Sequence, residues 1–218
     1  MKRLIIICEG PTEQEFCRKT LQIHFINKNI SIQYPLIKKS NGGIIDWRGV
    51  KSQIEIHLKQ DPKAYLTTFI DYYGVNKKHN FPKWIEASKI SDKSQRLNFI
   101  ESCLFQAIDS KINFRFIPYL QLHEFESLLF NNMDSFVKQF PEEMLLNVNE
   151  LENIINTYKN PEDINDHPKT APSKRLKNHF ENYKKVVFGN IIAEHIGLER
   201  IRKKSPRFNA WIETLEKI

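Results

Sequence analysis

The sequence predicts an α/β protein whose mostly parallel sheet is flanked by helices, with a helical C-terminal extension. Three observations predict this class: a β-branched apolar run near the N-terminus, later strand-like runs that alternate with helical patterns, and helical patterns alone beyond about Asp134. Such alternation is typical of βαβ units, whose crossovers are right-handed. With 218 residues and 40% hydrophobic content, the chain can bury a substantial core.

The first predicted strand covers residues 4–8, a continuous apolar run suited to burial on both faces of a parallel sheet. Glu9 and Gly10 follow directly, and the glycine permits a tight turn. Thr12 and Glu15 have the spacing of a capping box, which predicts that a helix begins here.

A second strand is predicted at residues 31–37, followed by a strong loop signal at residues 39–43 and a helix at residues 47–59. Residues 65–70 are rich in β-branched and aromatic side chains, which predicts a third strand. Asp71 stands where this strand ends, so an acid again follows a strand.

An amphipathic helix is predicted at residues 94–110, and a fourth strand, interrupted by a proline, at residues 113–122. Residues 123–126, with the sequence His-Glu-Phe-Glu, follow that strand. We predict two parts: an α/β core of residues 1–133, and a helical region of residues 134–218 that packs on the core rather than folding alone.

Composition argues against several classes of protein. The N-terminal apolar run is too short for a signal peptide, and the chain lacks a stretch of about 18 uncharged apolar residues, so neither secretion nor membrane spanning is expected. Three cysteines match no zinc pattern and predict reduced thiols in the cytoplasm. A net charge of +7 and a pI near 9.2 favour an anionic partner.

Acidic side chains stand at the ends of three predicted strands: Glu9, Asp71, and the pair Glu124 and Glu126. Ligands of open α/β sheets bind beyond the carboxyl ends of the strands, so these acids should meet there. Magnesium prefers carboxylate oxygens and needs only one or two of them beside substrate phosphate oxygens. The sequence therefore predicts a Mg²⁺ or Mn²⁺ site for phosphodiester chemistry on nucleic acid.

Each acid also has an ordinary structural interpretation. Glu9 would complement the dipole of the following helix, Asp71 would be a turn residue, and Glu124 and Glu126 would lie in a solvated helical turn. Their occurrence at three separate strand ends favours the metal site. His123 is a candidate general base or phosphate contact, although a lone histidine is more often structural.

Six segments of the chain carry a resemblance to a known family. They are residues 8–13, 69–74, 121–126, 160–166, 170–176 and 192–198. Together they resemble a bacterial family catalogued as domain of unknown function 4276, over nearly the whole chain. That family is similar to Toprim domains, the catalytic modules of topoisomerases, primases and overcoming-lysogenization-defect nucleases.

The Toprim pattern has a glutamate after the first strand and an Asp-x-Asp after a later one. The resemblance implies that Glu9 is the general acid/base or a metal ligand and that Asp71 is the first aspartate. It also implies that Glu13 is the second glutamate of the nuclease branch. From the residues alone, Glu13 is better explained as complementing the helix dipole.

Basic clusters in the helical region are candidates for phosphate contacts. We single out Ser173, Lys174 and Arg175, because Pro172 looks like a helix start, where backbone N–H groups bind anions. Three acids in the preceding loop are either an additional metal contact or ordinary loop acids and caps: Glu162, Asp163 and Asp166.

Two functions are therefore predicted. The first is a magnesium-dependent, Toprim-like nuclease that cleaves DNA or RNA. Members of Toprim-like groups are often encoded beside an ATPase of the ABC or structural-maintenance type, so the resemblance implies such a partner and an effector role in phage defence or abortive infection.

The second predicted function is a degenerate module that binds and regulates a partner ATPase without cutting. Tyr73 stands where Toprim enzymes have their second aspartate. Either Glu124 or Glu126 replaces that ligand, or metal binding is weakened. The oligomeric state, a homodimer included, is left open by the sequence.

Overall fold

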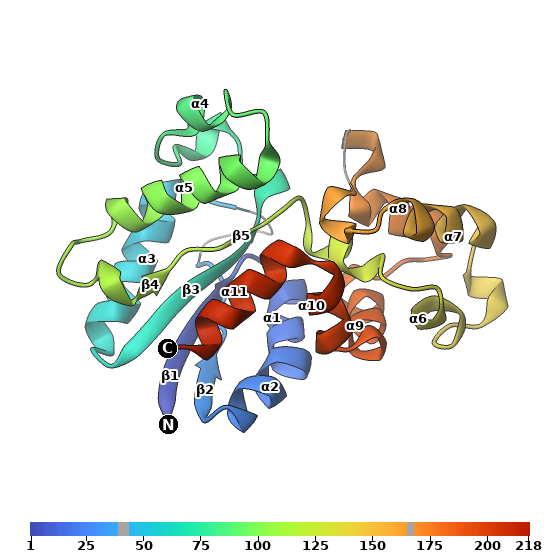
Figure 1. Ribbon diagram of the computed structural model, residues 1–218, viewed down its shortest axis with the longest axis horizontal. Coiled ribbons are helices and arrows are strands. Elements are labelled where there is room, and N and C mark those ends of the chain that lie inside the picture. The colour runs from blue at the N-terminus through green and yellow to red at the C-terminus, as the bar shows by residue number, and fades with distance from the viewer. Residues whose placement is uncertain (39–43, 165–167) are drawn as a thin grey trace.

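All strands of the sheet run parallel to one another (Figure 1). The computed structural model describes residues 1–38, 44–164 and 168–218, in which five strands lie in the order β2-β1-β3-β4, with β5 also paired to β3. The predicted α/β class is confirmed. The strands are β1 (Lys2–Cys8), β2 (Ile30–Gln33), β3 (Ala64–Asp71), β4 (Phe116–Ile117) and β5 (Leu120–Gln121).

The register of the sheet brings three strand ends to one edge. Cys8, the last residue of β1, pairs with Phe69 of β3, and Asp71 pairs with Gln121 of β5. Because the pairings are parallel, the segments that leave β1, β3 and β5 all emerge on the same side. The backbone pairing alone therefore places Glu9, Asp71 and residues 122–126 close together.

The alternation of β1 explains why its whole apolar run is buried. Leu4 and Ile6 pack into one hydrophobic cluster, whereas Ile5 and Ile7 pack into another on the opposite face of the sheet. Both faces are covered by helices, as expected for a parallel sheet.

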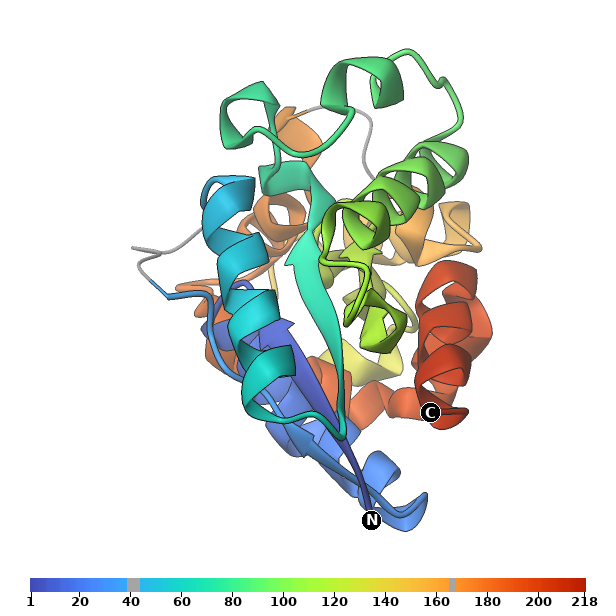
Figure 2. The same ribbon diagram turned by 90° about the vertical axis from the view of Figure 1, so that its left-hand side faces the viewer.

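Helices from both ends of the chain cover the first face, and helices from the middle cover the second (Figure 2). Side chains of α1 (Pro11–Phe16), α2 (Gln22–Asn27) and α11 (Pro206–Glu216) join the cluster on the first face. The same cluster continues into α6 (Asp134–Val137), α7 (Val148–Thr157), α8 (Pro172–His179), α9 (Lys185–Ile196) and α10 (Leu198–Lys204), of which α6, α7 and α8 lie to the side of the sheet in Figure 1. Those on the second face are α3 (Trp47–Gln60), α4 (Trp84–Ala87) and α5 (Lys93–Ala107). None of the helices in the described part of the chain combines the length and the apolar character that a membrane span requires.

Two local predictions need correction. The helix after β1 is capped by Gly10 and Glu13 rather than by Thr12 and Glu15: the Gly10 N–H donates to Glu13 Oε2 at 2.9 Å. The chain therefore turns two residues earlier than the capping-box spacing suggests, and Glu13 is buried inside the first turn.

The predicted fourth strand is two short strands. Residues 113–115 form a 3₁₀ turn, and β4 and β5 are separated at Pro118, which has no N–H for the ladder. The loop predicted at residues 39–43 lies outside the described residues.

Residues from both predicted parts of the chain share one core. Phe16 and Phe69 make ring contacts with Phe208 of α11, and Phe69 also contacts Trp211. Helix α11 therefore packs directly on the sheet, while the division at residue 133 stays a prediction.

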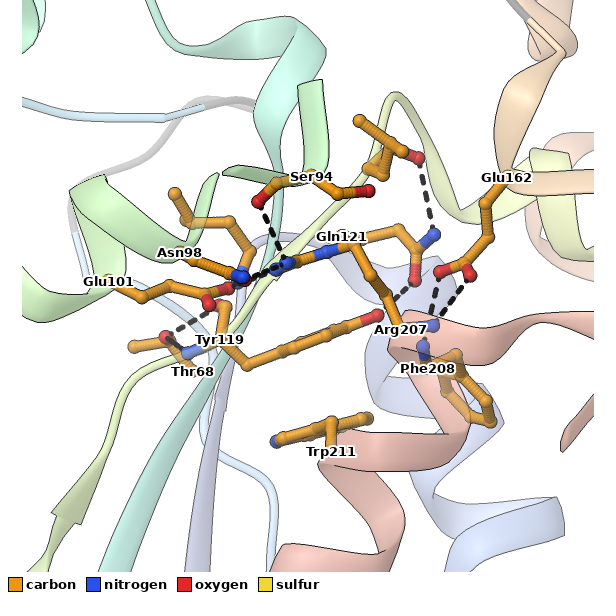
Figure 3. A network of polar contacts seen from close by, with 12 residues as sticks. Thr68, Ser94, Asn98, Glu101, Tyr119, Gln121, Glu162, Arg207, Phe208 and Trp211 are labelled. Atoms are coloured by element: carbon orange, nitrogen blue, oxygen red, sulfur yellow. Dashed lines mark hydrogen bonds and ion pairs between the residues drawn. The ribbon is translucent and has the colours of Figure 1, made fainter. Parts of the chain in front are cut away.

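Helix α11 is fixed to the sheet beside β5 by a polar network (Figure 3). The guanidinium of Arg207 contacts Glu101 of α5 at 2.6 Å, and the same carboxylate accepts a 2.8 Å hydrogen bond from the Leu120 backbone. The ring of Tyr119 stacks on Trp211 with centroids 4.2 Å apart. Helices on both faces are thus tied to the strand that leads into residues 122–126.

We expect Arg207→Met to lower the free energy of unfolding by about 3 kcal/mol, because it leaves Glu101 without its cation in a mostly buried place. The two side chains are 13% and 15% exposed. Urea unfolding at pH 8 measures the loss. The control is Lys138→Met, which breaks a pair whose side chains are 60% and 58% exposed and should cost about 0.5 kcal/mol or less. Equal losses in the two variants would contradict the structural role given to Arg207.

Candidate functional site

Glu9 and Asp71 are joined directly where β1 and β3 end. Glu9 Oε2 accepts a 2.9 Å hydrogen bond from the Asp71 backbone N–H, and Asp71 Oδ1 accepts a 2.9 Å hydrogen bond from the Phe125 backbone N–H. The carboxylates of Glu9 and Asp71 thus connect the ends of β1 and β3 to the segment that follows β5. The sequence prediction that these two acids lie together is met.

Glu13 enters the same site from the first turn of α1. Its side chain is buried with 3% exposure, and its carboxylate is held by the Gly10 N–H. Glu9 and Glu126 lie near enough for their charges to act on it. Glu13 therefore faces the other acids as well as capping its helix.

Glu126 is the most deeply buried acid of the group. It lies in the 3₁₀ helix Phe125–Leu129 with 0% exposure, and its Oε1 is 3.1 Å from Lys185 Nζ. Beyond this ion pair, neither carboxylate oxygen accepts a hydrogen bond from any residue that the structure describes. The Tyr183 hydroxyl, whose pKa is raised by burial and by the charge of Glu126, also lacks a hydrogen-bond partner among those residues.

The nearby positive charge is too small to stabilise the ionised forms of Glu9, Glu13, Asp71 and Glu126. Burial raises the pKa of Glu9, of Asp71 and of Glu126, and raises the pKa of Glu13 to about 8. The charges of neighbouring carboxylates add to this effect, and the ammonium of Lys185 opposes it. We refer to these four carboxylates as the acid cluster.

Lys185 is the cation that faces the acid cluster. Loss of water contacts lowers its pKa, but the charges of Glu126, Asp71 and Glu13 outweigh this and raise it above the usual value. Its side chain is still 43% exposed, whereas that of its partner Glu126 is 0% exposed.

Glu124 has a different role from its neighbour Glu126. Its carboxylate accepts hydrogen bonds from the Ser173 N–H at 2.9 Å and the Ser173 hydroxyl at 3.0 Å, at the beginning of α8. The predicted anion site at this helix start is therefore bonded to Glu124, an anion of the protein itself. Lys174 is exposed, and Arg175 Nε donates to the Thr170 carbonyl.

Glu162 caps helix α11, and its hydrogen bonds go to that helix rather than to the acid cluster. It is 1% exposed and accepts hydrogen bonds from the backbone N–H groups of Arg207 and Phe208, at the start of α11 (Figure 3). Asp163 follows it and is exposed. Asp166 lies outside the described residues.

His123 connects the candidate site to Tyr73 through the backbone. It has a left-handed φ of 67°, a conformation that costs a non-glycine residue free energy, and is 5% exposed. Its carbonyl accepts a 2.9 Å hydrogen bond from the Tyr73 N–H, and its Nε2 lies 3.5 Å from Lys93 Nζ. The strained residue thus shapes the turn between β5 and Glu126.

The acid cluster matches a hard divalent ion in donor chemistry. Its oxygens are carboxylate oxygens, the ligands that Mg²⁺ and Mn²⁺ prefer, and apart from the ion pair with Lys185 both oxygens of Glu126 lack a hydrogen-bond partner among the described side chains. Within those residues, no three acid, histidine or cysteine side chains are arranged as ligands of a single ion. The donors therefore fit in kind, while Lys185 forms an ion pair with Glu126 and its charge acts on the other three acids.

The sequence model of a family described as a domain of unknown function, DUF4276, matches residues 8–216. The chain belongs to the DUF4276 family. Among curated proteins and among solved structures, none matches the chain. The family description names no activity.

Two residues of the DUF4276 site, Lys185 and Tyr183, were not predicted as site residues. They lie at the start of α9 and just before it, about 60 residues beyond Glu126 in the sequence. Lys184 and Lys185 stand among several similar basic pairs, and no spacing marks one of them as the partner of a buried acid.

We expect Glu162→Ala to lower the free energy of unfolding by about 1–2 kcal/mol, as for other lost helix caps. Affinity for Mn²⁺ should stay unchanged, because Glu162 bonds to α11 and not to the acid cluster. Urea unfolding and calorimetry provide the two values. Glu152→Ala, an exposed position on α7, is the control. Weaker Mn²⁺ binding in Glu162→Ala would show that the cap is also a ligand.

The protein should lose stability as pH rises from about 4.5 to 8, and Glu13→Gln should reduce this loss. Because the pKa of Glu13 is raised to about 8 in the folded state, folding favours its protonated form, and that contribution disappears as the carboxyl ionises. Glutamine imitates the protonated form and can still accept from Gly10.

Metal-free urea unfolding between pH 5 and pH 8 tests this. The control is Glu15→Gln: Glu15 is paired with Arg18, which lowers its pKa, so its contribution is present at high pH and lost as pH falls. If Glu13→Gln and Glu15→Gln change the pH dependence of stability in the same direction, the raised pKa assigned to Glu13 is wrong.

Proposed function

We propose that this DUF4276 protein is a nuclease that hydrolyses phosphodiester bonds of nucleic acid with Mg²⁺ or Mn²⁺. The observation that carries the proposal is the meeting of Glu9, Asp71, Glu126 and Glu13 at the carboxyl ends of β1, β3 and β5. The net charge of +7 supports a polyanionic substrate.

Glu9, Asp71 and Glu126 are the residues that would hold the ion. A bound Mg²⁺ would polarise the phosphoryl group, lower the pKa of a water and stabilise the leaving oxygen. In Glu9 and Asp71 one carboxylate oxygen is fixed by a backbone N–H, which orients the other for a ligand role. Glu13 adds negative charge from one helical turn away. Glu124, bonded to Ser173, would hold the neighbouring helix start rather than the ion.

The biological role that we propose follows from the resemblance to Toprim-like groups. A nuclease of this kind would be the effector of a phage-defence or abortive-infection pair whose second member is an ABC or structural-maintenance-type ATPase. The basic clusters of the C-terminal helices, among them exposed Lys174, would supply phosphate contacts that weaken with salt.

Glu9→Gln should lower Mg²⁺-dependent cleavage of DNA or RNA by about 100-fold or more, because it removes a carboxylate proposed as ligand or base. Glutamine is nearly the same size and can still accept from the Asp71 N–H, so the fold should remain. Gel assays on plasmid DNA and on transfer and messenger RNA measure the activity. Circular dichroism checks folding.

Glu15→Gln is the matched control for this experiment, because it removes an acid from the same helix at an exposed salt bridge. It should cleave as the unmodified protein does. Full activity in a correctly folded Glu9→Gln protein would reject the catalytic assignment.

The alternative function is a regulatory module that binds the ATPase and does not cut. Two observations favour it: Tyr73, which is 39% exposed, stands in the place of an acid, and Lys185 forms an ion pair with Glu126 of the acid cluster. This function would be supported by tight binding to an ATPase encoded beside it together with calorimetry that detects no Mg²⁺ or Mn²⁺ binding.

A further inference from the structure

Lys185 forms an ion pair with the most buried carboxylate of the acid cluster and is itself partly exposed. Its Nζ is 3.1 Å from Glu126 Oε1, while 43% of its side chain is exposed and Glu126 is 0% exposed. The lysine begins α9, directly after the loop that joins α8 to α9. One ion pair thus holds a partly exposed lysine to a fully buried carboxylate.

The positive charge of Lys185 acts on more than its direct partner. The charges of Asp71 and Glu13 also act on the ammonium, and Glu9 is influenced by it in turn. One ammonium thus faces four carboxylates, which is the environment that a small cation would occupy. A divalent ion bound by Glu126 would lie next to this ammonium, and the two positive charges would repel each other.

We propose that Lys185 is a tethered counter-ion that takes the place of the divalent ion in the acid cluster and leaves Glu126 when the ion binds. This inference rests on the proposed metal-dependent function and concerns the regulation of the same site. Lys185 would then set the metal affinity of the protein and keep the buried acids compensated until the ion enters.

The two members of the ion pair differ in their freedom to move. The lysine has a flexible four-carbon stem, a strongly hydrated ammonium and an exposed side chain, so it can return to water. Glu126 is buried in the 3₁₀ helix Phe125–Leu129, and apart from Lys185 its carboxylate oxygens have no hydrogen-bond partner among the side chains that the structure describes. When Lys185 leaves, a cation must replace it, because an unpaired buried carboxylate is costly.

Calorimetric titration with Mn²⁺ tests the exchange in the full-length protein. Lys185→Met should bind Mn²⁺ about 10-fold or more tightly than the unmodified protein, because no ammonium has to be displaced. Lys184→Met removes the same charge from the adjacent, exposed position and should bind as the unmodified protein does. Equal or weaker binding in Lys185→Met overturns the inference.

A second measurement needs no variant. Acylation of lysines by acetic anhydride, followed by mass spectrometry, should be severalfold faster at Lys185 with saturating Mg²⁺, because the amine is no longer held by Glu126. Lys184 is the internal control and should react at the same rate with and without Mg²⁺. An unchanged rate at Lys185 contradicts the exchange.

The outcomes separate this inference from the proposed function. If all three proteins bind Mn²⁺ with one affinity, only the role of Lys185 is wrong. If none of them binds Mn²⁺ or Mg²⁺, the proposed metal-dependent function is wrong as well.

Discussion

The fold concentrates negative charge at one edge of a parallel sheet, and the rest of the site depends on this constraint. Because β1, β3 and β5 run in the same direction and in a fixed register, Glu9, Asp71 and Glu126 emerge together. Buried carboxylates whose charges act on one another favour their protonated forms or a cation. The raised pKa values and the ion pair with Lys185 are two consequences of the same placement.

The surrounding structure explains how this costly arrangement is held. β5 is two residues long and offers few ladder hydrogen bonds of its own, so helices fix its position: Glu101 bonds to its first N–H, and Arg207 ties that acid to α11. The turn that follows passes through His123 in a left-handed conformation before it reaches Glu126. Strain and buried charge thus occur within a few residues of each other, as is common at functional sites.

Sequence reasoning located what depends on local pattern and on strand direction. The β-branched run of β1 and the acids after the strands were sufficient to predict a parallel sheet with Glu9 and Asp71 together. The sequence patterns did not reveal that Glu124 caps α8 or that Lys185 faces Glu126. These contacts join segments about 50 to 60 residues apart through helix packing, which has no sequence period. The N-cap of α1 was predicted at Thr12 but is Gly10. A glycine has no side chain, so the sequence gives no capping signal at that position.

The central claim is that the acid cluster shares one divalent ion. A crystal structure of the protein with Mn²⁺, examined by anomalous scattering, tests it most directly. The account predicts one strong anomalous peak bonded to oxygens of Glu9, Asp71 and Glu126, with the Lys185 ammonium turned away from Glu126. A structure at saturating Mn²⁺ with no peak among these carboxylates, and with the Lys185 ion pair intact, would contradict it.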